Sequence, residues 1–180
     1  VGSEMCIRDS PGTAEQPFVV TDGLFDQTKT ESDLGLSKIE GAETVTVFTA
    51  TDDTDHYCNG VVMTEFKGKL YTQWQSSAKD EDAEDTWVAY SVSDDNGATW
   101  SEPKVLVPTI DNGYCSSGGW FVSGDTLVSY INVWYSDTTP RGGFAYYVES
   151  TDGEHWSEMK PVLMKDGTPM AVSYTHLRAH

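Results

Sequence analysis

The sequence has no long apolar run, few basic side chains and few cysteines. No stretch of its 180 residues approaches the roughly 18 consecutive apolar residues of a membrane-spanning helix, so we expect no membrane insertion. Eleven lysines and arginines stand against 29 acidic residues, for a net charge of −18, which argues against a nucleic-acid partner. Three cysteines are too few for a disulfide framework. Because 38% of the residues are hydrophobic and 12% aromatic, we expect a packed chain rather than a disordered acidic one.

The two ends of the chain differ in character from the rest. Residues 1–10 (VGSEMCIRDS) and 171–180 (AVSYTHLRAH) resemble translated sequencing-adapter sequence, and we expect both to be foreign to the protein. The domain is then expected to span residues 11–170, and within this range Arg141 is the only arginine of the sequence.

A repeat spans the middle of the chain. Its matching residues lie 57 positions apart and include Tyr57-Cys58 with Tyr114-Cys115, Ser93 with Ser150 and Asp95 with Asp152. Within each repeat, β-branched and aromatic residues alternate between Gly-bearing turns, and no segment has the periodicity of an amphipathic helix. Four short strands in a repeat of this length are typical of a β-propeller blade.

We therefore predict an all-β fold, a fragment of a β-propeller with two to three four-stranded blades. The blades are expected at about residues 59–108 and 117–164, after a strand at Thr44–Phe48 that ends an earlier blade. Because so few blades cannot close a ring, the remaining blades are expected as partners outside this sequence.

Each repeat also contains a short turn motif. Residues 93–100 (SDDNGATW) fit the pattern S-x-D-x-G-x-T-W, and residues 150–156 (STDGEHW) are a shortened form. In such a turn the Asp carboxylate accepts backbone hydrogen bonds, Gly supplies a positive φ and Trp buries its ring. Two such motifs at matching places resemble the Asp boxes, or BNR repeats, of the sialidase-like β-propellers. The resemblance implies a structural role, away from the active site, for Ser93, Asp95, Gly97, Thr99, Trp100, Ser150, Asp152, Gly153 and Trp156.

The same resemblance implies where a substrate would bind. Sialidase-like propellers bind it where the first strand of each blade begins and where the second strand passes to the third. On this sequence those places imply substrate contacts from Asn59, Asp82, Tyr114, Ser116 and Arg141.

The resemblance further implies a glycosidase reaction. The family's acid/base Asp lies eight residues before the Asp-box Ser, which implies Asp85, whose acidic neighbours favour its protonated form. The implied activity is exo-α-sialidase-like hydrolysis of terminal sugars from extracellular glycans, without a cofactor and with a nucleophile outside this sequence. Cys58, however, stands where the family carries an arginine that pairs with the substrate carboxylate.

Two other function classes stay open. Some sialidase-like propellers are polysaccharide lyases that use His and Tyr, which makes His56 a candidate base and Tyr57 or Tyr114 a candidate acid on an acidic glycan. A glycan-binding propeller without catalytic machinery would keep only the Asp boxes and the aromatic residues.

Three side-chain groups have both a structural and a functional interpretation. Residues 80–85 (DEDAED) form either a solvated acidic loop or, more weakly, a Ca²⁺ site at Asp80, Asp82 and Asp85. A disulfide between Cys58 and Cys115 is disfavoured, because inner strands of adjacent blades are not hydrogen-bonded neighbours. Four tryptophans can stack on sugars but are expected mainly to pack blade against blade: Trp74, Trp87, Trp120 and Trp134.

Overall fold

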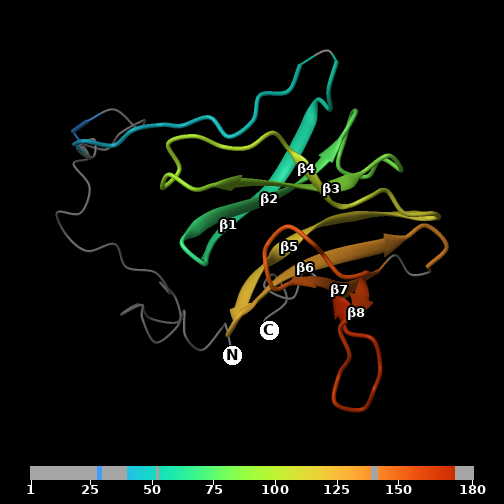
Figure 1. Ribbon diagram of the computed structural model, residues 1–180. Helices are drawn as coiled ribbons and strands as arrows, with labels where there is room; N and C mark the ends of the chain where they lie inside the picture. Colours follow the sequence, from blue (N-terminus) through green and yellow to red (C-terminus); the bar gives the residue numbers. More distant parts are fainter. Residues whose placement is uncertain (1–27, 30–39, 52, 139–141, 173–180) are drawn as a thin grey trace. The chain divides into compact units, whose positions relative to one another are not determined.

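The computed structural model describes residues 28–29, 40–51, 53–138 and 142–172. The chain divides into two compact units, one made of residues 1–44 and 174–180 and the other of Val45–Ser173. In the first unit, the described residues 28–29 and 40–44 are exposed and lie in turns or irregular backbone. The second unit contains two antiparallel sheets (Figure 1). Across the described ranges there is no α-helix, and so no helix that could cross a membrane.

The first sheet has four strands in the order of the sequence. They are β1 (Tyr57–Phe66), β2 (Lys69–Ser77), β3 (Trp87–Ser93) and β4 (Lys104–Val107). A two-residue turn joins β1 to β2, and both of its residues, Lys67 and Gly68, have positive φ (50° and 75°). Two positive φ values in a two-residue hairpin match the right-handed twist of the flanking strands.

The second sheet repeats this order. Its strands are β5 (Gly113–Ser123), β6 (Thr126–Tyr135), β7 (Gly143–Ser150) and β8 (Lys160–Pro161), and the short β9 (Ala171–Val172) also pairs with β7. The two consecutive antiparallel sheets confirm the predicted all-β fold and fit a fragment of a β-propeller. Residues 171–172, at the start of the segment expected to be foreign, are part of this sheet, whereas residues 1–10 and 173–180 lie outside the described residues.

The predicted strand at Thr44–Phe48 is wrong. These residues have irregular backbone, and none of the described strands pairs with them. Alternating side chains favour an extended backbone, but a strand also needs a neighbour for its ladder of hydrogen bonds. Phe48 instead stacks on Trp74, with ring centroids 5.9 Å apart.

The second sheet covers one face of the first. Trp120 of β5 and Trp156 of the β7–β8 turn pack edge-on against Tyr71 and Tyr90, with centroid distances of 6.3 and 5.6 Å. The Trp120 indole N–H donates to the Val62 carbonyl at 3.2 Å. These rings surround a core whose buried members come from both sheets, including Phe66, Leu106, Leu127, Ile131, Val133 and Val148.

A buried amide also joins the two sheets. Gln73 in β2 is fully buried; its amide nitrogen donates to the Gly119 carbonyl at 2.9 Å, and its amide oxygen accepts from the Ser129 hydroxyl at 2.8 Å. Both polar ends of the Gln73 side chain are therefore satisfied across the interface, as a buried polar group requires.

The two Asp-box turns form as predicted. Asp95 accepts hydrogen bonds from the Thr99 backbone N–H at 2.8 Å and the Thr99 hydroxyl at 2.6 Å, and Gly97 has a φ of +88°. These bonds, with that from Ser93, lower the pKa of Asp95 to about 2. The Trp100 indole N–H closes the turn on the Gly97 carbonyl at 3.1 Å.

In the second turn, His155 takes the place of Thr99. The Asp152 carboxylate accepts from the backbone N–H groups of Glu154 and His155 at 2.8 Å, and pairs with the His155 ring at 2.8 Å. These contacts lower the pKa of Asp152, and the hydrogen bond to Asp152 raises the pKa of His155. Gly153 has a φ of +77°, and a Cβ there would lie 2.1 Å from the Tyr71 hydroxyl, so only Gly fits between the sheets.

The strand register separates the Asp boxes from the start of each blade. At one end of the first sheet, Tyr57 pairs with Ser77, and Ser76 pairs with Trp87. At the other end, Leu70 pairs with Ser93, the first residue of the Asp box. The first residues of β1 and the loop between β2 and β3 therefore share the end opposite to the Asp box.

Candidate functional site

Glu81 connects the first residues of β1 to the β2–β3 loop. The Tyr57 hydroxyl donates to a Glu81 carboxylate oxygen at 3.1 Å, and the Asn59 amide donates to the same oxygen at 3.3 Å. Partial burial and the Glu81 carboxylate raise the pKa of Tyr57, so the phenol is protonated at neutral pH. Tyr57 and Asn59 are next-but-one neighbours in a strand and so lie on one face of the sheet. A ring, an amide and a carboxylate thus meet at the end of the sheet where a substrate is expected.

The loop itself is held by bonds to its backbone. The Gln75 amide donates to the Glu81 carbonyl at 2.6 Å, and the Ser77 hydroxyl donates to the Asp80 carbonyl at 2.5 Å. At the other end of the loop, the Thr86 hydroxyl donates to the Ala83 carbonyl. All three donors belong to residues that are at least nine-tenths buried, so the sheet fixes the path of the loop.

Asp85, the predicted acid/base residue, lies in this loop and is exposed. One of its carboxylate oxygens accepts from the Ala78 backbone N–H at 3.1 Å, which closes the loop across its base. Asp82, the predicted substrate contact in the loop, is also exposed, and its backbone N–H donates to an Asp80 carboxylate oxygen at 3.2 Å. The loop therefore presents its carboxylates to solvent.

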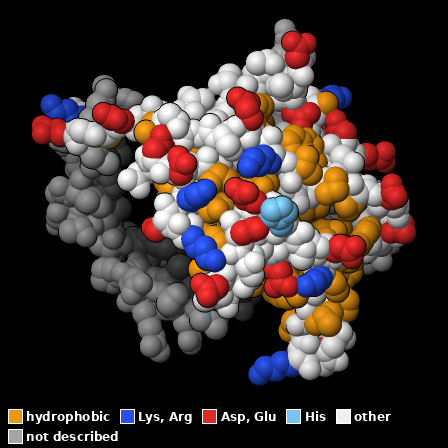
Figure 2. All heavy atoms as spheres, in the orientation of Figure 1, with side chains coloured by type: hydrophobic (Ala, Val, Ile, Leu, Met, Phe, Trp, Pro, Cys, Tyr) orange, Lys and Arg blue, Asp and Glu red, His pale blue; other side chains and the backbone are white. Residues whose placement is uncertain are grey.

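The charge at this end of the first sheet is negative. Five acidic residues lie between positions 80 and 85, and Figure 2 shows acidic side chains spread over the visible face among fewer basic ones. None of the residues that the structure describes is an arginine, and Arg141 lies outside them. Within the described part of the chain, the family's arginine cluster for a carboxylated sugar is therefore not formed.

His56, the candidate base, directly precedes β1 and is exposed. The residue before it, Asp55, is held in place because its carboxylate accepts from the Ser76 hydroxyl at 2.8 Å and from the Trp87 indole N–H. His56 thus follows a fixed residue and leads directly into Tyr57.

The second sheet places Tyr114 and Ser116 in β5, at the positions equivalent to Tyr57 and Asn59. The Tyr114 ring stacks on Trp134 at 6.4 Å, and Ser116 pairs with Asn132 in the ladder. The two inner strands also touch directly, because the Ser117 hydroxyl donates to the Gly60 carbonyl at 2.5 Å. The two equivalent tyrosines therefore have different neighbours: Tyr57 contacts Glu81, and Tyr114 stacks on Trp134.

Neither of the two cysteines that the structure describes is in a disulfide. Cys58 is exposed and Cys115 is buried, and both are free thiols. Burial raises the pKa of Cys58 and raises that of Cys115 to about 12, so neither is an activated nucleophile. The calcium site considered for the acidic loop is not formed: among the residues described, no three His, Cys, Asp or Glu side chains could hold a metal ion.

The tryptophans mostly pack inside the protein. Trp120 lies between the sheets, and Trp134 stacks on Tyr114. Trp74 and Trp87 line a small pocket with Phe48 and Asp55 on the other face of the first sheet. The Trp74 indole N–H is buried with no hydrogen-bond partner. It lies near the Cys58 thiol and lowers the pKa of that thiol, but burial of Cys58 has the larger effect and raises this pKa.

Sequence reasoning missed the role of Glu81. The acidic loop was predicted to contribute through Asp82 and Asp85, whereas Glu81 makes the contacts to β1. The tight turn at Lys67-Gly68 was the available signal, because counting outward from it places Tyr57 near Ser77 and so beside the loop.

Comparison with known proteins identifies the family. The sequence model of a family described as a BNR repeat-like domain matches residues 68–174, more than half of the chain. The chain belongs to this BNR repeat-like family. The match covers both Asp boxes and eight of the nine described strands, β2 to β9, in full.

One of two solved structures compared with this BNR repeat-like chain has a similar fold. A crystal structure of a protein of unknown function from Dyadobacter fermentans is 13% identical, with a TM-score of 0.53 over 69% of this chain and 43% of that one. An alpha-L-arabinanase from Penicillium chrysogenum, complexed with arabinobiose, is 15% identical with a TM-score of 0.44, over 64% of this chain and 34% of that one. The chain thus spans less than half the length of either structure. No curated protein matches it.

Proposed function

We propose that this BNR repeat-like chain is part of an extracellular, carbohydrate-active protein, and that the glycan binds where β1 begins in the first sheet. The observation that carries the proposal is the contact of Tyr57 and Asn59 with Glu81. A phenol ring, an amide and a carboxylate supply an apolar surface together with hydrogen-bond donors and acceptors, which suits a sugar. The end of the sheet is also the one implied by the resemblance to sialidase-like propellers.

The reaction that best suits these groups is exo-acting hydrolysis of a terminal glycosidic bond. The Tyr57 hydroxyl donates a hydrogen bond to the Glu81 carboxylate. Glu81 can therefore take the phenol proton as the phenol oxygen attacks the anomeric carbon of the sugar. Asp85 in the same loop is the candidate acid that protonates the departing oxygen. The Asp85 carboxylate then takes a proton from a water molecule as that water attacks the anomeric carbon and breaks the glycosyl-tyrosine bond. Glu81 returns its proton to the phenol oxygen, so Asp85 and Tyr57 are both protonated again at the end of the cycle.

The negative charge of the site affects which class of terminal sugar can bind there. A sialic acid or uronic acid carboxylate would approach five acidic residues, and its pairing would depend on Arg141 or on residues beyond this sequence. A neutral terminal sugar has no such repulsion. The exo-α-sialidase hypothesis is therefore tested beside neutral glycosides.

The test measures dye release by the full chain from a panel of fluorogenic glycosides, one sialoside and several neutral sugars. Tyr57→Phe keeps the ring and removes the hydroxyl, and we expect it to lower kcat by at least about 100-fold, the usual contribution of a reacting or proton-transferring group. Tyr130→Phe is the control, because it removes a hydroxyl from an exposed tyrosine of the second sheet that is outside the candidate site. Equal rates for Tyr57→Phe and the unmodified chain would refute the assignment of Tyr57.

A lyase is the second candidate, favoured by one observation. Tyr57 directly follows His56 in the chain, so its phenol, which carries a proton at neutral pH, can serve as the acid beside His56 as the base. Growth of unsaturated-uronate absorbance on an acidic polysaccharide, lost in His56→Ala, would move the assignment to this class. Glycan binding without either reaction would assign a non-catalytic binding propeller.

A further inference from the structure

The first strand of the first sheet has an irregular segment beside the candidate site. The register between β1 and β2 shifts within residues 59–62, and Gly60 in this segment has a φ of +64°. Such an irregularity bends a strand and redirects its side chains, and Gly adopts this backbone at the lowest cost. Tyr57 and Asn59 lead into Gly60 and are the residues that contact Glu81. The geometry of the site therefore depends on how residues 59–62 are held.

The second sheet holds this segment at two points. The Ser117 hydroxyl of β5 donates to the Gly60 carbonyl at 2.5 Å, and the Trp120 indole N–H of the same strand donates to the Val62 carbonyl at 3.2 Å. A Cβ on Gly60 would lie 2.7 Å from the Ser117 hydroxyl oxygen, so β1 and β5 approach this closely because residue 60 is Gly. Both donors belong to the second repeat, so one sheet fixes the path of a strand in the other.

Ser117 has a well-defined position in the second sheet. It pairs in the ladder with Ile131, which is fully buried in the core. Its carbonyl also accepts from the Asn132 side-chain amide at 3.4 Å. The Ser117 hydroxyl therefore reaches Gly60 from a strand that the core holds in place.

Hydrogen bonds continue from Gly60 into the candidate site. The Gly60 backbone N–H donates to the Asn59 side-chain oxygen at 2.7 Å, and the Asn59 side-chain nitrogen donates to Glu81 at 3.3 Å. The same Glu81 oxygen accepts from the Tyr57 hydroxyl. Any movement of Gly60 is thus passed to both residues of β1 that contact Glu81.

We propose that Ser117 is a positioning residue of the candidate glycan site, acting through its bond to Gly60. The bond keeps Tyr57 and Asn59 in contact with Glu81, so that the carboxylate is placed to take the phenol proton. This inference rests on the function proposed above, because it assigns Ser117 no contact with the sugar. One sheet thus completes the site that the preceding sheet carries.

The test compares three variants at position 117 of the full chain. Ser117→Ala removes the hydroxyl. Ser117→Val and Ser117→Thr are both β-branched and similar in size, and they differ in that a methyl group of Val replaces the hydroxyl of Thr. The comparison of these two variants therefore isolates the hydroxyl from any effect of the added methyl group.

The first measurement is the titration of Tyr57 by NMR, in protein labelled with carbon-13 at tyrosine Cζ. The Tyr57 signal is assigned by its absence from Tyr57→Phe. Burial raises the pKa of Tyr57 most, and the contact with Glu81 raises it further. We expect this pKa to fall in Ser117→Ala and Ser117→Val, because the contact with Glu81 is lost, and to stay raised in Ser117→Thr.

The second measurement is kcat on the fluorogenic glycoside that the unmodified chain hydrolyses. A displacement of about 1 Å in a reacting group lowers a rate by up to about 100-fold. We expect Ser117→Ala and Ser117→Val to lower kcat by about 10- to 100-fold and Ser117→Thr to keep most of the rate. If the unmodified chain hydrolyses no glycoside, the proposed function fails, while the titration of Tyr57 still decides whether Ser117 positions it.

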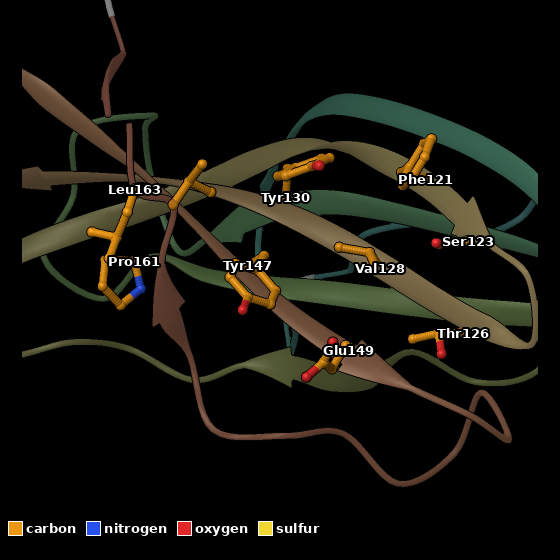
Figure 3. Close-up of a pocket in the computed structure, with 10 residues that line it drawn as sticks. Phe121, Ser123, Thr126, Val128, Tyr130, Tyr147, Glu149, Pro161 and Leu163 are labelled. Atoms are coloured by element: carbon orange, nitrogen blue, oxygen red, sulfur yellow. The ribbon is translucent and has the colours of Figure 1, made fainter. Parts of the chain in front are cut away.

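Two serine variants distinguish positioning from a general loss of stability. Ser129→Ala removes another hydroxyl that joins the two sheets, but it bonds to Gln73 in β2 and not to β1. Ser123→Ala changes β5 itself, at a residue that lines a pocket formed with β6 and β7 (Figure 3). We expect both variants to leave the pKa of Tyr57 and kcat unchanged, although Ser129→Ala lowers the free energy of unfolding.

Two results would overturn the proposal. One is a Tyr57 titration that is the same in the unmodified chain, Ser117→Ala and Ser117→Val. The other is an equal change in Ser129→Ala and Ser117→Ala, which would show that the loss of any hydroxyl between the sheets disturbs the site.

Discussion

The buried amide of Gln73 gives a quantitative test of how the two sheets are held together. Replacement by Leu preserves the approximate size of the side chain but removes the donor to Gly119 and the acceptor for Ser129. Ser129 is fully buried, so its hydroxyl is left unsatisfied at a cost of about 1–3 kcal/mol. The half-buried Gly119 carbonyl adds about 1 kcal/mol. We expect Gln73→Leu to lower the free energy of unfolding by about 2–4 kcal/mol.

Urea unfolding followed by tryptophan fluorescence measures this change. With a slope of about 2 kcal/mol per molar urea, the midpoint should fall by about 1–2 M. Adding Ser129→Ala to Gln73→Leu removes the unsatisfied hydroxyl, so the double variant should be about 1–3 kcal/mol more stable than Gln73→Leu alone.

A matched control distinguishes the stability lost at the interface between the sheets from the stability lost whenever a buried amide is removed. Gln75 is buried in the same strand, but its amide donates to the Glu81 carbonyl in the loop of its own sheet. Gln75→Leu should therefore cost only about 1 kcal/mol. A double variant less stable than Gln73→Leu, or equal losses at positions 73 and 75, would refute the account of the interface.

Two further predictions concern the Asp-box turns. Gly153→Ala should destabilise the chain, because the added Cβ meets the Tyr71 hydroxyl and Ala resists the positive φ, and a second change of Tyr71→Phe should recover part of the loss in thermal unfolding. Because the pKa of Asp95 falls to about 2 on folding, its stabilisation is present above the unfolded pKa of about 4 and is lost as pH falls toward 2. Asp95→Asn should flatten this part of the stability–pH curve measured by urea unfolding, and an unchanged curve would contradict the hydrogen bonding described for the turn.

The local features of the fold could be read from the sequence. The 57-residue offset placed both sheets, because equivalent residues such as Leu70 and Leu127 occupy equivalent strand positions. The Asp boxes were predictable because their bonds join residues at most four positions apart. The Thr44–Phe48 strand failed because alternation reports on an extended backbone and not on whether a partner strand lies beside it.

The candidate site was predictable only in part. Tyr57 and Asn59 were expected at a substrate-facing end, and the structure places them at the end opposite to the Asp box. The contact of Glu81 with both residues depends on the register between β1 and β2, which shifts at an irregularity between Asn59 and Val62. A sequence does not show such a shift, so the partner of Tyr57 could not be chosen among neighbouring acidic residues.

The anchoring of the acidic loop has a consequence for how binding preferences can diverge. Gln75, Ser77 and Thr86 hold the loop through the carbonyl oxygens of Glu81, Asp80 and Ala83, which any amino acid at those positions would supply. The side chains at the tip can therefore be exchanged while these three attachments are kept. If the proposed glycan site is correct, relatives with the same blade can acquire new ligand preferences by point mutations at the tip of the loop, without any change in the strands beneath, while Asp85 is kept because its carboxylate binds the Ala78 backbone N–H.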